Sequence, residues 1–110
     1  MIEILILTLK PGSRNAFQNI YEAEALPLLL KWKFNLVAHG PSLHDENSYY
    51  VIRSFKSLED RQQSEDTYYN SDDWRNGPRA SIMSMIEHEA YLVVPKEAIQ
   101  NWLDPLSEIK

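Results

Sequence analysis

Residues 68–79 combine aromatic and cationic side chains that could bind an organic anion. The stretch reads Tyr-Tyr-Asn-Ser-Asp-Asp-Trp-Arg-Asn-Gly-Pro-Arg, and no hydrophobic periodicity accounts for it. Tyr69 and Trp74 offer flat apolar surfaces, and small-molecule pockets favour aromatic residues beside a few polar groups. Arg79 can clamp a carboxylate or an enolate. We therefore expect Tyr69, Trp74 and Arg79 to contact a ligand.

The same stretch also has a purely structural interpretation. A tryptophan on a short helix often fills a gap in the core, and Gly77-Pro78 can break a helix before the next strand. Arg75 and Arg79 would then pair locally with an acidic neighbour such as Asp72, Asp73 or Glu87. The sequence leaves both interpretations open.

His39 and Arg53 are the candidates for catalysis. Histidine is a suitable general base because its ordinary pKa lies near neutrality. Arg53 lies between apolar neighbours in a strand, and a half-buried arginine must be paired or hydrogen-bonded. Arg53 is therefore either part of an ion pair at an interface or a cation inside a pocket.

We expect neither a metal site nor a cofactor. His39 and His44 have acidic residues nearby, but their spacing fits no established metal-ligand pattern. The sequence contains no nucleophile elbow, phosphate loop or dinucleotide fingerprint. Its only glycines are Gly12, Gly40 and Gly77, too few for loops that cradle phosphate.

The composition limits the classes of partner. The chain has 110 residues, a formal charge of -5 and no lysine or arginine cluster, which disfavours nucleic acids and anionic membranes. There is no cysteine, and the first residues lack the basic region and cleavage site of a signal peptide. Residence in the cytoplasm is the expectation.

The elements that must position these residues follow the order strand, helix, strand, strand, helix, strand. The patterns predict strands at 2–9, 34–38, 49–55 and 90–94. A first helix should begin at Ser13, whose side chain can cap it, and should kink or end near Ala25 because Pro27 lacks a backbone donor. A second helix should span 58–69, with Ser57 as its N-cap and Asp60 three residues on. A glycine–proline bend should end the second strand at 39–42, and a short helical turn should run over 78–85. The tail 95–110 should begin as an amphipathic helix and end at Asp104-Pro105; its apolar positions are Ile99, Trp102, Leu103 and Leu106.

This order predicts an α+β, ferredoxin-like βαββαβ fold with a four-stranded antiparallel sheet and helices on one face. The first and third strands are apolar on both faces, so the face without helices would expose a large apolar patch. A second copy packed sheet to sheet in a two-fold dimer would cover it. A C-terminal helix folded over the same face is the alternative.

Three motifs resemble the NIPSNAP family, within the wider group of dimeric α/β-barrel proteins. They are Leu-Lys-Pro-Gly at 9–12 followed by Phe17, Phe-Lys-Ser-Leu-Glu-Asp-Arg at 55–61, and the run from Tyr69 to Arg79. The resemblance implies one domain over residues 1–110, with a core at 2–94, that dimerises through its sheet. The sequence departs from the family at Leu5 and Leu7, where an arginine and an aromatic are common, and at Arg53, where a tryptophan is common.

The resemblance implies little about activity, because the family has no settled reaction. Related barrel families include cofactor-free monooxygenases, isomerases and haem-handling enzymes with pockets between sheet and helices. We expect a homodimer that binds or transforms a small organic molecule in such a cleft. An enzyme of this kind would carry out cofactor-independent proton transfer or oxygenation of an electron-rich acid or phenol. The alternative is a non-catalytic structural or protein-interaction module.

Overall fold

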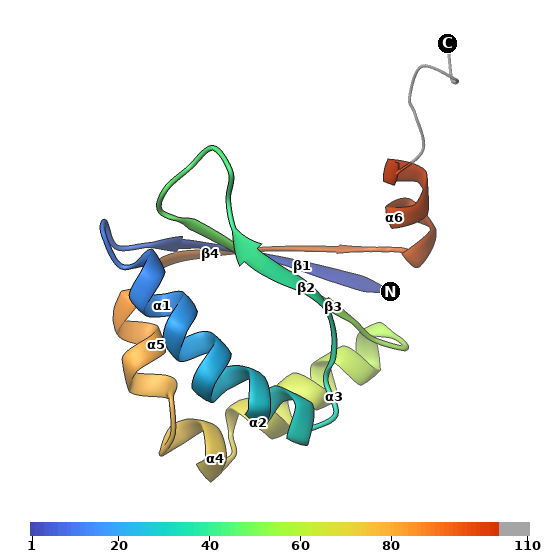
Figure 1. Ribbon diagram of the computed structural model, residues 1–110. Helices are drawn as coiled ribbons and strands as arrows, with labels where there is room; N and C mark the ends of the chain where they lie inside the picture. Colours follow the sequence, from blue (N-terminus) through green and yellow to red (C-terminus); the bar gives the residue numbers. More distant parts are fainter. Residues whose placement is uncertain (104–110) are drawn as a thin grey trace.

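The computed structural model describes residues 1–103 and has the predicted order of strands and helices (Figure 1). The elements are β1 (Ile2–Leu9), α1 (Arg14–Ile20), the π-helical turn η1 (Tyr21–Ala25), α2 (Leu26–Lys31), β2 (Asn35–Pro41), β3 (Ser48–Ser54), α3 (Leu58–Tyr69), α4 (Asp72–Arg75), α5 (Arg79–Met85), β4 (Ile86–Val94) and α6 (Lys96–Leu103). None of the helices in this range has the length and apolar character needed to cross a bilayer.

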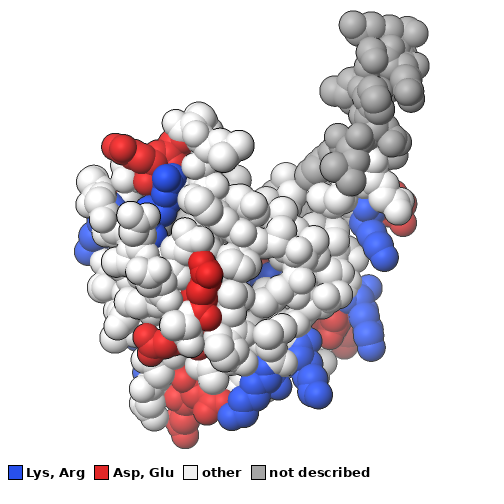
Figure 2. Space-filling view, viewed as in Figure 1, with Lys and Arg blue, Asp and Glu red and all other residues white. Residues whose placement is uncertain are grey.

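The four strands form one antiparallel sheet in the order β2-β3-β1-β4, so β1 and β3 are central as predicted. Helices α1 to α5 all lie on one side of the sheet (Figure 1). The α+β, ferredoxin-like fold is confirmed. Figure 2 shows acidic and basic side chains interspersed over the helical layer and the β2–β3 hairpin.

The two faces of the sheet differ in how well they are covered. Leu5 and Leu7 of β1 point toward the helices and are buried. On the opposite face, Ile6, Tyr50 and Leu92 are 47%, 36% and 51% exposed. Helix α6 follows the end of β4 (Figure 1), and these three side chains stay exposed. The C-terminal helix, as far as residue 103, therefore does not cover this face.

The α6 helix spans part of the predicted tail. It runs from Lys96 to Leu103, as the apolar spacing predicted. Leu106, the last apolar position of that pattern, and the expected stop at Asp104-Pro105 lie outside the described residues.

Of the two expectations for the region near Ala25, a kink or an end, the structure shows an irregular turn after which the helix continues. At η1 the backbone N–H of Leu26 donates to the carbonyl of Tyr21, five residues earlier. This wider turn places Pro27 in the first turn of α2, where its missing N–H is tolerated. Ser13 precedes the helix but makes no side-chain capping bond, so that expectation was wrong. Its backbone is already helical, and a capping serine usually has extended backbone angles.

Two strand boundaries differ from the prediction. Strand β2 continues through Pro41, and its irregularity lies earlier, between Leu36 and Ala38. Proline is compatible with this position because β2 is an edge strand. Strand β4 begins at Ile86 rather than Ala90, because its first residues pair with the end of β1.

The start of α3 agrees with the sequence. Ser57 accepts a hydrogen bond from the Asp60 backbone N–H at 3.0 Å, and the Asp60 carboxylate accepts one from Lys56 N–H at 3.0 Å. These bonds satisfy amide groups that the first turn of a helix leaves without partners. The helix ends where Ser71 caps the short α4 in the same way.

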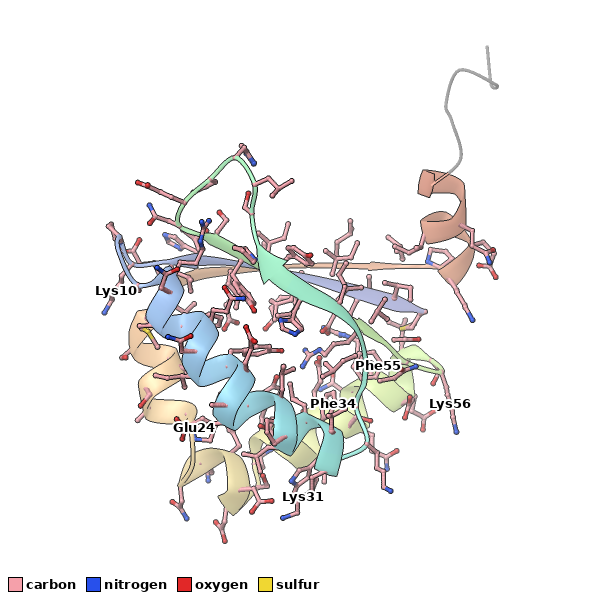
Figure 3. The ribbon with its side chains drawn as sticks, in the orientation of Figure 1. Lys10, Glu24, Lys31, Phe34, Phe55 and Lys56 are labelled. Atoms are coloured by element: carbon pink, nitrogen blue, oxygen red, sulfur yellow. The ribbon has the colours of Figure 1, made fainter. Side chains whose placement is uncertain are left out.

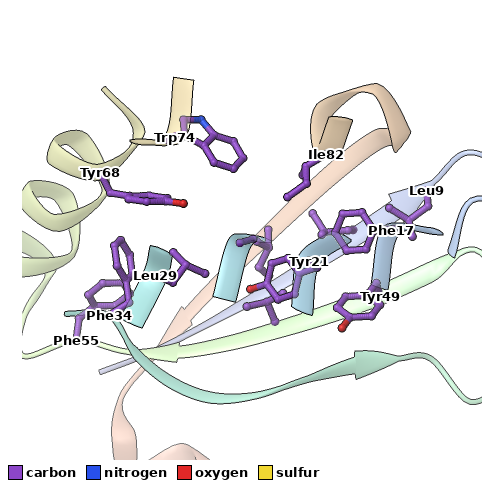
Figure 4. Packing of buried hydrophobic residues seen from close by; sticks show 14 residues of the cluster. Leu9, Phe17, Tyr21, Leu29, Phe34, Tyr49, Phe55, Tyr68, Trp74 and Ile82 are labelled. Carbon is purple, nitrogen blue, oxygen red and sulfur yellow. The ribbon is translucent and has the colours of Figure 1, made fainter. Parts of the chain in front are cut away.

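Aromatic side chains form much of the core between sheet and helices (Figure 4). Phe17 is fully buried, with its ring 5.1 Å from Tyr49 and 5.7 Å from Tyr21. At the other end of the sheet, Phe34 and Phe55 pack edge to face at 6.0 Å (Figure 3). These contacts help to set the distance between the helices and the sheet. That distance determines how much space is left unfilled between the two layers.

Candidate functional site

A cavity of about 370 Å³ lies between the sheet and the helices. The sheet side is formed by residues of β1, β3 and β4, and the helical side by residues of every helical element from α1 to α5. The volume lies within the range of small-molecule sites. Its polar or aromatic lining residues are Phe17, Tyr21, Arg53, Tyr68, Tyr69, Trp74, Arg75, Arg79, Glu89 and Tyr91.

Trp74 and two tyrosines form an aromatic wall of the cavity. The Trp74 ring lies 5.3 Å from Tyr69 in an edge-to-face arrangement and 5.8 Å from Tyr68. Trp74 is only 8% exposed. It therefore fastens α4 to α3 and lines the cavity, which combines the two interpretations that the sequence left open.

Arg75 and Arg79 are exposed and line the same cavity. Neither guanidinium group makes a hydrogen bond or an ion pair with another residue in the described part of the chain. The local pairing proposed for them is absent there, and Asp73 instead binds Lys31 at 2.8 Å and the Trp32 indole N–H at 3.0 Å. Both guanidinium groups are thus available to an anion.

Gly77 and Pro78 separate α4 from α5 and so place Arg79 at the start of α5. A Cβ added at Gly77 would overlap the backbone carbonyl oxygen of Asp73. Only glycine fits this close approach between two turns. The predicted helix break is confirmed, and its role is to redirect the chain along the cavity.

Arg53 faces the helices and is 2% exposed. Its Nε donates to Glu3 Oε1 at 2.7 Å, one Nη donates to the Tyr69 hydroxyl at 2.9 Å, and the other to Glu65 Oε2 at 2.9 Å. The guanidinium also lies 5.2 Å from the centre of the Phe34 ring. Arg53 is therefore an ion-paired cation at the cavity, and it points away from the open face of the sheet.

The partners of Arg53 form a network that sequence reasoning missed. Arg61 Nε donates to Glu3 Oε2 at 2.6 Å, so one fully buried carboxylate binds two arginines. Glu65 bridges the same two arginines from α3. One signal was present in the sequence: Glu3 is the only charged residue on the leucine face of β1, and it pairs in register with Arg53.

The charges of this network shift the pKa values of its carboxyl groups. Burial raises the pKa of Glu65 to about 7, and the adjacent Glu3 carboxyl adds to the increase. Burial also acts to raise the pKa of Glu3, but hydrogen bonds and the charges of the arginines hold it below its ordinary value. The two carboxyls titrate as a pair in which the proton resides on Glu65. Burial likewise raises the pKa of the Tyr69 hydroxyl.

The structure does not bring His39 to the cavity. His39 lies on the edge strand β2, and its Nδ1 is 2.8 Å from the Tyr49 hydroxyl. It is absent from the residues that line the cavity. The structure does bring together the other predicted residues, Arg53, Tyr69, Trp74 and Arg79, around the cavity. The role of His39 as a base remains a prediction.

The metal interpretation of His39 and His44 finds no support in the described residues. His44 Nδ1 contacts Ser42 Oγ at 3.1 Å. No group of three histidine, aspartate or glutamate side chains suited to a metal ion occurs within residues 1–103.

Comparison with models of known protein families assigns the chain to one of them. The NIPSNAP family model matches residues 2–97. The chain belongs to the NIPSNAP family. No curated protein matches it significantly.

Solved structures of NIPSNAP proteins share the fold. A NIPSNAP family protein of unknown function from Agrobacterium tumefaciens has 23% identity and a TM-score of 0.79, with 84% of each chain covered. An uncharacterised NIPSNAP-like domain protein from Burkholderia xenovorans has 17% identity and a TM-score of 0.79, covering 94% of this chain and 87% of that one. A putative antibiotic biosynthesis monooxygenase from Nitrosomonas europaea has 13% identity and a TM-score of 0.61, covering 86% and 95%. At these identities the likeness concerns the fold alone.

Proposed function

We propose that this NIPSNAP protein binds a small organic molecule with an apolar ring and an anionic group in the cavity between sheet and helices. The observation that carries the proposal is the pairing of an aromatic cavity of about 370 Å³ with two guanidinium groups, Arg75 and Arg79, that have no acidic partner among the described residues. Aromatic walls accept a ring, and a guanidinium accepts a carboxylate or an enolate.

The charge of the site supports an anionic ligand. The chain as a whole carries a charge of -5. The two arginines without an acidic partner, Arg75 and Arg79, are therefore not part of a general excess of positive charge. Arg53 contributes less to anion binding because Glu3 and Glu65 already occupy its guanidinium. We therefore assign the anion contact to Arg79, with Arg75 beside it.

Titration with a matched pair of probes tests this assignment. We expect 4-acetylbenzoate to bind more tightly than the neutral 4-acetylbenzamide, as measured by calorimetry or ligand-observed NMR. Arg79→Ala should weaken benzoate binding about tenfold, since a hydrogen bond to a charged group contributes about 1.5–3 kcal/mol and exposure reduces it. Lys10→Ala removes an equal charge from an exposed residue outside the cavity and serves as the control.

Two outcomes of this titration would reject the proposal. One is equal binding of the acid and the amide by the wild-type protein. The other is an equal loss of benzoate affinity in Arg79→Ala and Lys10→Ala, which would show that Arg79 acts only through the net charge of the protein.

The reaction that we expect, if the ligand is transformed, is cofactor-independent proton transfer or oxygenation of an electron-rich acid or phenol. The fold shared with proteins named putative antibiotic biosynthesis monooxygenases motivates this expectation, although a shared fold does not transfer function. Glu89 is the only carboxylate among the described residues that line the cavity, and its Oε2 accepts a hydrogen bond from Tyr91 at 2.8 Å. It is the group to test as a base, in preference to His39.

The proposal includes a homodimer formed through the open sheet face and a cytoplasmic location. The exposed apolar side chains of Ile6, Tyr50 and Leu92 support the dimer, because a stable monomer rarely exposes such a patch. The alternative of a structural module without a ligand draws support from the packing of Trp74 on Tyr68 and Tyr69. The cavity beside Trp74 counts against it.

A further inference from the structure

The Tyr68 hydroxyl is a buried polar group without a partner. Tyr68 is 1% exposed, and among residues 1–100 its oxygen is the one buried side-chain polar atom that makes no hydrogen bond. Burial of an unpaired hydroxyl is unfavourable, so native proteins usually supply a partner for it. A phenylalanine at this position would fill the same space without that cost.

Four aromatic rings hold Tyr68 in its orientation. Its ring centre lies 4.9 Å from that of Tyr69, 5.4 Å from Phe34, 5.8 Å from Trp74 and 6.0 Å from Trp32. A side chain enclosed in this way cannot turn to carry its hydroxyl to the surface. The oxygen therefore stays where the packing places it.

That place is the cavity. Tyr68 lines it, and Figure 4 shows the hydroxyl between Trp74 and Leu29, directed toward Ile82. The Tyr69 hydroxyl differs, since it accepts a hydrogen bond from Arg53. Burial raises the pKa of Tyr68, so at neutral pH the group is a neutral hydroxyl that can donate a hydrogen bond.

We infer that the Tyr68 hydroxyl is the inner hydrogen-bond donor of the ligand site and selects ligands that carry an acceptor oxygen, such as a carbonyl, in addition to their anionic group. The inference rests on the proposed function and refines its ligand class. The ligand would then combine a ring against Trp74, an anionic group at Arg79 and an acceptor at Tyr68. Tyr68 acts in this site as a specificity-determining residue.

Two pairs of nearly isosteric benzoates test the inference. The probes are 3- and 4-acetylbenzoate, which carry a carbonyl acceptor, and 3- and 4-isopropylbenzoate, which do not. We expect the wild-type protein to prefer at least one acetyl compound over its isopropyl counterpart by about tenfold, the value of one net hydrogen bond. Tyr68→Phe should abolish this preference.

A second measurement separates a ligand contact from a structural role. Tyr68→Phe should leave the melting temperature of the ligand-free protein unchanged or higher, because no hydrogen bond within the described protein is lost. Tyr49→Phe is the matched control: its hydroxyl contacts His39, and the residue does not line the cavity. That variant should keep the preference for the acetyl compounds.

The outcomes distinguish the inference from the function on which it rests. Equal binding of acetyl and isopropyl compounds by the wild-type protein, or a preference that survives in Tyr68→Phe, overturns the inference and leaves the anion site intact. A lower melting temperature of ligand-free Tyr68→Phe with unchanged preference assigns the hydroxyl a structural role and also overturns it. Failure of all four benzoates to bind overturns the proposed function, and the inference falls with it.

Discussion

Glu3 and Arg53 face each other across neighbouring strands of the sheet, joined by a hydrogen bond of 2.7 Å, and neither is more than 2% exposed. The pair places two full charges beneath the cavity. Arg61 and Glu65 extend it from α3: Arg61 binds Glu3, and Glu65 contacts both arginines. The network thereby fixes α3 against the sheet.

We predict that Glu3→Gln destabilises the protein by about 3–5 kcal/mol, because removal of one partner leaves buried charge uncompensated. Urea unfolding followed by circular dichroism would measure the change. The double variant Glu3→Leu/Arg53→Met removes both charges and is the control; it should recover more than half of the loss. A cost below about 1 kcal/mol for Glu3→Gln would show that the pair is dispensable.

Glu65 gives the stability of the protein a dependence on pH. Because its pKa is raised from 4.5 to about 7 in the folded protein, the folded state binds this proton more tightly than the unfolded state. Its contribution is complete below about pH 4.5 and is lost as the pH rises through about 7. We expect a loss on the order of 2 kcal/mol between pH 5 and pH 8, since one pKa unit corresponds to about 1.4 kcal/mol.

Melting temperatures from pH 5 to pH 8 would test this dependence, with Glu65→Gln as the control that cannot ionise. The variant should have a flatter profile over this range. The lowered pKa of Glu3 acts in a separate range, because its contribution is lost only as the pH falls below about 4.5. Identical profiles for the wild type and Glu65→Gln would contradict the assignment.

We predict that substitution of two glycines is unfavourable for different reasons. Gly77→Ala should destabilise by about 1–3 kcal/mol, because the new methyl group overlaps the Asp73 carbonyl. Gly12 has φ of 80° with open space around it, so Gly12→Ala should cost only about 1 kcal/mol of backbone strain. Asparagine adopts such a φ readily, so Gly12→Asn should cost less than Gly12→Ala, whereas Gly77→Asn should not recover stability. Thermal unfolding of the four variants would decide whether steric overlap is the cause.

Charge on the open sheet face should disrupt the proposed dimer. Ile6→Lys places an ammonium group in the centre of the apolar patch, and we expect light scattering to report a monomer at concentrations where the wild type is a dimer. Leu43→Lys is the control, because Leu43 is fully exposed in the β2–β3 hairpin and outside that patch. A wild-type protein that is monomeric at micromolar concentration would refute the dimer.

Local signals predicted much of the fold. The cap at Ser57, the break at Gly77-Pro78 and the apolar faces of β1 depend on residues close together in the chain, and all three agree with the structure. For the first helix the sequence left open whether it kinks or ends near Ala25; the π-helical turn that resolves this is stabilised by packing and has no clear sequence signature.

The candidate site was predicted in part. The run from Tyr69 to Arg79 supplied four lining residues, Tyr69, Trp74, Arg75 and Arg79, because one segment of the chain carries all of them. His39 had suitable chemistry, but its position on an edge strand turned it toward Tyr49 and away from the cavity. Residue type indicated what the side chain could do and could not indicate what it would face.

The sequence by itself determined the order of strands and helices, the family and the segment that carries the arginines. Only the tertiary structure decided that Arg53 is paired with Glu3, fifty positions away, and that Tyr68 keeps a free hydroxyl in a cavity. Both facts depend on how closely distant segments approach. Periodicity and capping act within a few residues, whereas partners and cavities arise where layers meet, and that distance is set by the packing of the whole core.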